Sequence, residues 1–187
     1  MSTILGVCGY SGAGKTTFCR EMARRFALPV LSTGEVVRRR VLERGLQLTP
    51  ETIARVSDEI REETGGRFLR VLAPDLLHRF GGSPAVLLDC LREESDLLTA
   101  RELADRVVLI AITAGDEVRA GRSLGRGRPG DPASRHEALA LHAIEERLGV
   151  AQLLAGADAV LANDGDLGPF VERATLLVSG ILARGGG

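Results

Sequence analysis

The chain has 187 residues, of which 44% are apolar and 26% are charged, and its formal net charge is −1. This length and composition are typical of one globular domain with a hydrophobic core. The small net charge and the 3% of aromatic residues argue against a nucleic-acid-binding surface, and no apolar run approaches the roughly 18–20 residues that a membrane span needs.

The cysteines and the N-terminus bear on the cellular compartment. Cys8, Cys19 and Cys90 show no Cys-x-x-Cys spacing, and an odd number of cysteines without a pattern is typical of a reducing compartment. Residues 1–10 lack the basic segment of a signal peptide and lead into a glycine-rich loop. We therefore expect a cytoplasmic protein, monomeric or homodimeric, that binds neither nucleic acid nor membrane.

Short apolar runs alternate with helical patterns along the chain. After Lys15, the apolar residues Phe18, Met22 and Phe26 recur every four positions, as they do on the buried face of a helix. The expected strands cover residues 3–8, 30–31, 85–89, 106–112 and 157–162. The expected helices start at 15, cover 35–44, start at 50, cover 67–79 and 116–124, restart at 131–132 and follow 169.

This alternation predicts a parallel sheet with helices on both faces. Crossover connections in such a sheet are right-handed, and ligands lie at the carboxyl ends of its strands. The glycine-rich stretch at residues 9–17 directly follows the first expected strand. The motif and the architecture therefore predict a ligand site at the same edge of the sheet.

Residues 9–17, GYSGAGKTT, match the phosphate-loop pattern Gly-x4-Gly-Lys-[Ser/Thr] in full. Glycines let backbone N–H groups turn toward a phosphate, and the helix that starts at Lys15 adds its own unpaired N–H groups. Lys15 is the only lysine of the chain; we expect it to reach the β- and γ-phosphates of a nucleotide, and the Thr16 hydroxyl to bind Mg²⁺. The predicted nucleotide-binding residues of the loop are Gly12, Ala13, Gly14, Lys15, Thr16 and Thr17.

Missing motifs narrow the class of phosphate-loop protein. The Asn-Lys-x-Asp motif of guanine-specific GTPases needs a second lysine, which this chain lacks. Asp89 is followed by Cys90, where hydrolases of the motor and AAA types generally place a glutamate that activates water. Transporter ATPases need a signature loop and a longer chain. The remaining expectation is phosphoryl transfer to a bound small molecule, a reaction that depends on positioning and charge neutralisation.

Arginines follow the second and third expected strands. Arg38 lies in the STGEVVR stretch, and Arg92 comes three residues after Asp89. Both segments lie at the edge of the sheet that carries the phosphate loop, so the two arginines could hold an acceptor phosphate bidentately. The alternative, that they are solvated residues of an arginine-rich chain, stays open. A Gly- and Pro-rich segment, expected to be a lid over the transferring phosphoryl group, carries Arg119, Arg122, Arg126 and Arg128.

The stretches GYSGAGKTT, LSTGEVVR, LLDCLR, GRGRPGDP and ADAVLANDGDL together resemble the nucleoside-monophosphate-kinase-like P-loop kinases. The second stretch resembles the Ser-Thr-Gly-Asp-x-x-Arg segment of adenylate kinases, and the whole is similar to an adenylate-kinase-related group described as dephospho-coenzyme A kinase-like. The likeness spans residues 4 to about 174. It implies a single α/β/α domain over 1–187 with a five-stranded parallel sheet in order 2-3-1-4-5, an acceptor-binding helical insert at about 33–80 and a lid at about 119–135.

The resemblance also implies roles for individual residues. ATP with Mg²⁺ would be the phosphoryl donor, and Asn163 would lie near the adenine, although it also fits a plain turn residue in NDGD. The acceptor would contact Thr33, Gly34, Arg38 and Arg92. The catalytic residues would be Lys15, Asp89, Arg122, Arg126 and Arg128, and the metal would be held by Thr16 and Asp89.

Three departures from the family pattern bear on the acceptor. Glu35 stands where adenylate kinases have Asp, and Cys90 stands where they have Gly. Leu141 and His142 occupy the places of an Arg-Asp pair that usually assists transfer, so the transferring arginines are expected in the lid, and His142 fits either a charge donor or a structural residue.

The acceptor and the class of function stay open at the level of sequence. Asp89 fits two roles, holding a Mg²⁺-bound water or orienting an acceptor hydroxyl. The first role suits transfer to a nucleoside monophosphate, which is the preferred expectation. The second suits an alcohol such as dephospho-coenzyme A, a nucleoside or a specialised metabolite. A protein of another class, an ATP-binding switch or weak ATPase without a small-molecule acceptor, shares the same phosphate loop.

Overall fold

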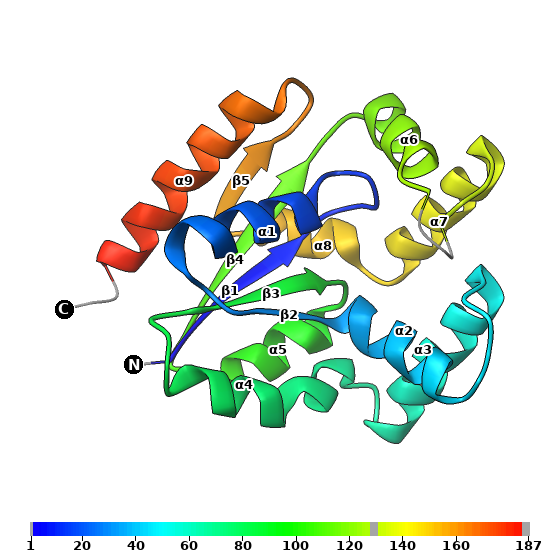
Figure 1. Cartoon of the computed structure of the whole chain (residues 1–187), viewed down its shortest axis with the longest axis horizontal. Helices are drawn as coiled ribbons and strands as arrows, with labels where there is room; N and C mark the ends of the chain where they lie inside the picture. The colour runs from blue at the N-terminus through cyan, green and yellow to red at the C-terminus, as the bar shows by residue number, and fades with distance from the viewer. Residues whose placement is uncertain (1, 128–130, 185–187) are drawn as a thin grey trace.

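The computed structural model describes residues 2–127 and 131–184, in which five parallel strands form one sheet in the order β2-β3-β1-β4-β5 (Figure 1). The order predicted from the family resemblance is confirmed. The strands are β1 (Thr3–Cys8), β2 (Val30–Ser32), β3 (Val86–Leu91), β4 (Arg106–Thr113) and β5 (Ala159–Ala162).

Helices cover both faces of this sheet (Figure 1). The helices that precede β4 in the sequence are α1 (Lys15–Phe26), α2 (Thr33–Glu43), α3 (Pro50–Glu63), the 3-10 helix η1 (Phe68–Leu72), α4 (Ala73–Phe80) and α5 (Glu94–Leu103). The helices that follow β4 in the sequence are α6 (Asp116–Gly125), α7 (Arg135–Arg147), α8 (Val150–Ala155) and α9 (Leu167–Ala183). Within the described part of the chain, no helix combines the length and the apolar content needed to cross a membrane.

The alternation of side chains along β1 explains why both faces need a cover. Ile4 and Cys8 belong to the apolar cluster under α2, α4, α5 and α8, whereas Leu5 and Val7 belong to the cluster under α1 and α9. All four side chains are fully buried. A strand that is apolar on both faces must lie inside a three-layer fold, as the sequence predicted.

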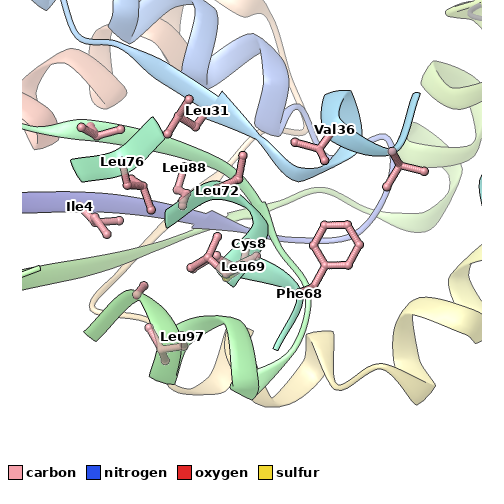
Figure 2. Close-up of a cluster of buried hydrophobic side chains, with 14 of the residues drawn as sticks. Ile4, Cys8, Leu31, Val36, Phe68, Leu69, Leu72, Leu76, Leu88 and Leu97 are labelled. Carbon is pink, nitrogen blue, oxygen red and sulfur yellow. The ribbon is translucent and has the colours of Figure 1, made fainter. Parts of the chain in front are cut away.

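The expected insert covers residues 33–80, and its second half is part of the hydrophobic core. Figure 2 shows Phe68, Leu69, Leu72 and Leu76 packed together with Ile4 and other strand residues. Each of the four is at most 5% exposed. Val36, Val41, Val56 and Ile60, earlier in the insert, are buried in the same cluster. Both halves of the insert therefore contribute to the core, while its role in acceptor binding stays a prediction.

Several helix boundaries differ from the sequence expectation. The helix expected over 67–79 is instead η1 followed by α4, because Pro74 lies at the first turn of α4 and has no N–H to continue an earlier helix. The helix expected from 131–132 begins at Arg135, where Ser134 Oγ accepts a hydrogen bond from Glu137 N at 3.2 Å. Helices α5 and α8 were not expected, since neither has a long apolar period; α8 has only 6 residues.

Candidate functional site

A polar cavity of about 280 Å³ lies at the carboxyl ends of β1, β2 and β3. The phosphate loop contributes one wall, the start of α2 and the segment after β3 contribute the opposite wall, and α6 with the residue after it contributes a third. The lining residues are Ser11, Gly12, Gly14, Lys15, Thr16, Thr17, Ser32, Gly34, Arg38, Asp89, Arg92, Arg122 and Arg126. Most of the residues singled out in the sequence therefore meet in one place.

The phosphate loop has a backbone that only glycine can follow. Gly12 has φ 80° and Gly14 has φ 106°, both in the left-handed region. A Cβ at Gly12 would lie 2.2 Å from Arg119 O, and one at Gly14 would lie 2.3 Å from Asn163 Nδ2. Both conformation and space therefore require glycine, and the loop can curve its amides around an anion.

Lys15 begins α1 and is only 9% exposed. Its Nζ donates to Gly9 O at 2.7 Å and to Tyr10 O at 2.9 Å. The ammonium group is thus held by two carbonyl oxygens of its own loop while it lines the cavity. A buried cation in that place favours an anionic ligand.

Thr16 and Asp89 form a pair that fits a divalent cation. Thr16 Oγ1 donates to Asp89 Oδ2 at 2.9 Å, and Asp89 is 6% exposed. The other carboxylate oxygen, Oδ1, is buried and accepts no hydrogen bond from the described residues. Because Mg²⁺ prefers carboxylate and hydroxyl oxygens and keeps waters and phosphates as its other ligands, these two side chains fit the predicted metal role.

Arg38 and Arg92 line the same cavity as the phosphate loop. Arg38 comes from α2, which begins directly after β2 because Ser32 Oγ accepts a hydrogen bond from Glu35 N at 3.4 Å. The Nη1 of Arg38 lies 3.3 Å from the position that a Cβ on Gly34 would take. The glycine therefore leaves room for the arginine beside the cavity.

A buried carboxylate holds the backbone at Arg92. Asp96 Oδ2 accepts hydrogen bonds from the N–H of Arg92 at 3.1 Å and of Glu93 at 3.4 Å, and burial raises the pKa of Asp96. Glu93 in turn accepts from Arg61 Nε at 2.6 Å, and the Arg61 guanidinium lies 5.7 Å from the centre of the Phe68 ring. Helix α3 is thereby tied to the segment that presents Arg92.

The lid arginines divide into three groups. Arg122 lines the cavity and donates to Asn163 O at 2.7 Å, and Arg126 lines it while pairing with Asp131, with Nε to Oδ2 at 2.8 Å. Arg119 is not at the cavity: it is 6% exposed, its guanidinium lies 4.5 Å from the centre of the Tyr10 ring, and its Nη2 donates to Asp116 Oδ1 at 2.6 Å. Arg128 lies outside the described residues. The Arg119 side chain thus packs against Tyr10 of the phosphate loop, while the lid expected at about 119–135 stays a prediction.

Asn163 and Thr33 do not line the cavity. Asn163 is 5% exposed, its Nδ2 donates to Ala13 O at 2.8 Å, and its N–H donates to Thr113 O at 2.7 Å. It therefore braces the phosphate loop, and the predicted contact with adenine stays a prediction. Thr33 is the first residue of α2 and is buried, so any contact with an acceptor would pass through its neighbours.

Helix α7 contributes two residues that the sequence analysis did not name, Glu145 and Glu146, and it also carries His142. Glu145 is 1% exposed, and its carboxylate accepts from Ser11 N at 2.9 Å and from Ser11 Oγ at 2.8 Å. The Tyr10 hydroxyl donates a hydrogen bond to Glu146 at 2.7 Å. Burial, as the larger cause, and this hydrogen bond raise the pKa of Tyr10 to about 12. His142 lies beside the Tyr10 ring, with 6.2 Å between ring centres. No motif marks Glu145 and Glu146, whereas His142, which the sequence had singled out, does not line the cavity.

Comparison with known proteins finds relatives over nearly the whole chain. A family described as an AAA domain matches residues 8–138. The UPF0200 protein of Thermococcus gammatolerans is 32% identical over 192 residues, covering 98% of this chain and 99% of the relative. A protein of known structure from Thermus thermophilus is similar with a TM-score of 0.65 at 22% identity, covering 97% of this chain and 98% of the other. A gluconokinase from Sinorhizobium meliloti is similar with a TM-score of 0.59 at 19% identity, covering 98% and 94%.

Proposed function

This chain belongs to the UPF0200 family and has a P-loop kinase fold, and from that premise we propose that it transfers a phosphoryl group from ATP to a small acceptor that itself carries a phosphate. A nucleoside monophosphate or a nucleotide-like molecule is the preferred acceptor. The observation that carries the proposal is the single cavity that joins the phosphate loop to Arg38 and Arg92.

The donor end would hold the triphosphate. The N–H groups of the loop and of the first turn of α1 would bind the β- and γ-phosphates, and Lys15 would exchange its carbonyl partners for phosphate oxygens. Thr16 and Asp89 would hold Mg²⁺, which neutralises charge on the phosphates when it is bound. Arg122 and Arg126, on a third wall of the same cavity, would stabilise the charge on the transferring group.

The acceptor end would hold a phosphate. Arg38 and Arg92 offer planar donor pairs that match phosphate oxygens. In the transfer, an acceptor oxygen forms a bond to the γ-phosphorus as the bond from that phosphorus to the β,γ-bridging oxygen breaks, and ADP leaves. Because the oxygen of a bound phosphate is already anionic, no general base is needed, and Asp89 remains available to the metal.

An alcohol acceptor is the second candidate, and the observation that favours it is the unpartnered Oδ1 of Asp89. A buried carboxylate oxygen at the cavity can accept the proton of a hydroxyl nucleophile. The names of the structural neighbours include gluconokinase, which supports small-molecule phosphorylation in general. The expected cytoplasmic location and the monomeric or dimeric state stay predictions.

The test is ADP release from MgATP, measured with a panel of acceptors that includes nucleoside monophosphates, nucleosides, dephospho-coenzyme A and sugar acids. We expect many-fold stimulation by a phosphate-bearing acceptor. Stimulation by an alcohol without a phosphate would favour the second candidate. A rate of ATP hydrolysis that does not depend on any acceptor, or ATP binding without turnover, would contradict the kinase proposal. Either result would indicate a switch or a weak ATPase.

A further inference from the structure

A buried carboxylate on helix α7, that of Glu145, accepts hydrogen bonds from the phosphate loop. Glu145 lies 134 residues from Ser11 in sequence, and its two oxygens accept from the Ser11 N–H at 2.9 and 3.1 Å and from the Ser11 hydroxyl at 2.8 Å. Within the described ranges, no Arg, Lys or His nitrogen pairs with it. The hydrogen bonds of this carboxylate therefore all go to one residue of the loop.

Glu145 acts on the outer side of the loop. Ser11 lines the phosphate cavity, whereas Glu145 does not. The carboxylate is thus not a group that an incoming phosphate would touch. It affects the shape of the cavity through the conformation that it imposes on Ser11, where the loop turns from Tyr10 toward Gly12.

Two features of α7 make this contact more than a local brace. The next residue, Glu146, accepts the Tyr10 hydroxyl at 2.7 Å, so consecutive residues of α7 hold consecutive residues of the loop. At its other end, α7 follows the lid segment, and Arg135 forms an ion pair with Glu117 of α6. Helix α7 is therefore connected both to the nucleotide loop and to the predicted lid.

We propose that Glu145 is a positioning residue that fixes the outer arm of the phosphate loop through Ser11 and so couples nucleotide binding to helix α7. A loop held in shape binds phosphate more tightly because less conformational freedom is lost on binding. Coupling between two sites is reciprocal, so a nucleotide that tightens the loop also stabilises α7 against opening. The inference rests only on the nucleotide-binding part of the proposed function.

The experiment measures MgADP and MgATP affinity by calorimetry for wild type, Glu145→Ala, Glu145→Gln and the matched control Glu172→Gln. Loss of charge-assisted hydrogen bonds predicts a Kd about tenfold or more higher for Glu145→Ala. Glu145→Gln keeps a neutral acceptor for Ser11 and should restore part of the affinity. Glu172 is exposed on α9, and Glu172→Gln should change the Kd less than about twofold because it removes a carboxylate that does not contact the loop.

Hydrogen exchange provides the readout that a purely structural role would not move. In wild type, MgADP should increase the protection of amides in α7 as well as in the first turn of α1. In Glu145→Ala the protection in α1 should persist at saturating MgADP, while the ligand-dependent protection in α7 is lost. Ligand-dependent protection of α7 that survives in this variant would overturn the coupling.

Ser11→Ala keeps the proposal testable if Glu145→Ala does not fold. This substitution removes the hydroxyl contact and leaves the N–H contact, so it should weaken MgADP binding less than loss of the carboxylate does. Unchanged affinity in both Glu145→Gln and Ser11→Ala would overturn the inference while leaving the proposed function intact. Failure of wild type to bind either nucleotide would overturn both.

Discussion

The two ends of the cavity are built differently. At the donor end, buried hydrogen bonds hold each part of the loop: Lys15 to its own carbonyls, Ala13 to Asn163, and Ser11 to Glu145. At the proposed acceptor end, the two arginines are supported differently. Buried Asp96 holds the backbone at Arg92, whereas α2, which carries Arg38, shares an apolar cluster with α3 and is otherwise tied to it by exposed ion pairs, Arg40 with Glu63 and Arg44 with Glu59.

The polar contacts between α2 and α3 are therefore the part of the site that can adjust most readily. Exposed ion pairs contribute little, about 0–1 kcal/mol each, and salt screens them. Buried hydrogen bonds to charged groups contribute about 1.5–3 kcal/mol each. The proposed donor end should therefore bind one kind of ligand with a fixed geometry. The identity of the acceptor should depend on the positions that α2 and α3 adopt around it.

The largest effect should come from Lys15→Ala, which tests the donor end. Removing the only lysine takes away the cation that faces the phosphates, and we expect kcat to fall by at least about 100-fold. The fold should remain, since the side chain's hydrogen bonds are within its own loop. Steady-state ADP release and far-UV circular dichroism would measure both, and a variant with full activity would remove Lys15 from the phosphate site.

The next effect tests the acceptor end with Arg38→Ala and Arg92→Ala. If each arginine holds the acceptor phosphate equally in the ground state and the transition state, the acceptor KM should rise about 10–100-fold with little change in kcat or in the KM for ATP. Initial rates over a matrix of both substrates would separate these constants. Unchanged kcat and KM values for an arginine would place it outside the site.

A matched pair of glycine substitutions compares the ends directly. Gly14→Ala would force a positive φ on alanine and bring a Cβ to 2.3 Å from Asn163 Nδ2, so we expect a loss of stability of about 1–3 kcal/mol. Gly34→Ala would bring a Cβ to 3.3 Å from the flexible end of Arg38; its cost should be under about 0.5 kcal/mol. Urea unfolding of the two variants measures the contrast, which equal losses would contradict.

The smallest effect concerns Asp96, behind Arg92. Burial raises the pKa of Asp96, so the folded state holds this proton more tightly than the unfolded state does. The group therefore adds stability as the pH falls toward its ordinary value near 4 and costs stability at neutral pH.

The variant Asp96→Asn keeps an oxygen for the N–H groups of Arg92 and Glu93. Its Tm should exceed that of wild type by about 2 °C at pH 7, which corresponds to a gain of less than ~1 kcal/mol in the free energy of unfolding. The gain should shrink at pH 5, because Asp96 is more protonated there. Thermal scans at both pH values test this, and a gain that grew at pH 5 would contradict the assignment.

The elements that sequence predicted well are those whose signal is local. The apolar run of β1, the glycines of the loop and the position of Lys15 are all read from adjacent residues, and the sheet order followed from family resemblance. Helix α8 was missed because 6 residues cannot show a period. The helix start placed at 131–132 was wrong because Asp131-Pro132 resembles a cap, and only the structure shows that Ser134 accepts the N–H.

The sequence by itself determined the fold class and the glycine-rich loop, and it predicted the roles of Lys15, Thr16 and Asp89, because a phosphate site needs particular residue types at fixed spacing next to a strand and a helix. Only the tertiary structure decided what holds that loop. Asn163 and Glu145 reach it across 150 and 134 residues, and the same packing places the Arg119 guanidinium against the Tyr10 ring. Contacts at such separations depend on how helices dock on the sheet, and no local pattern of residues encodes them.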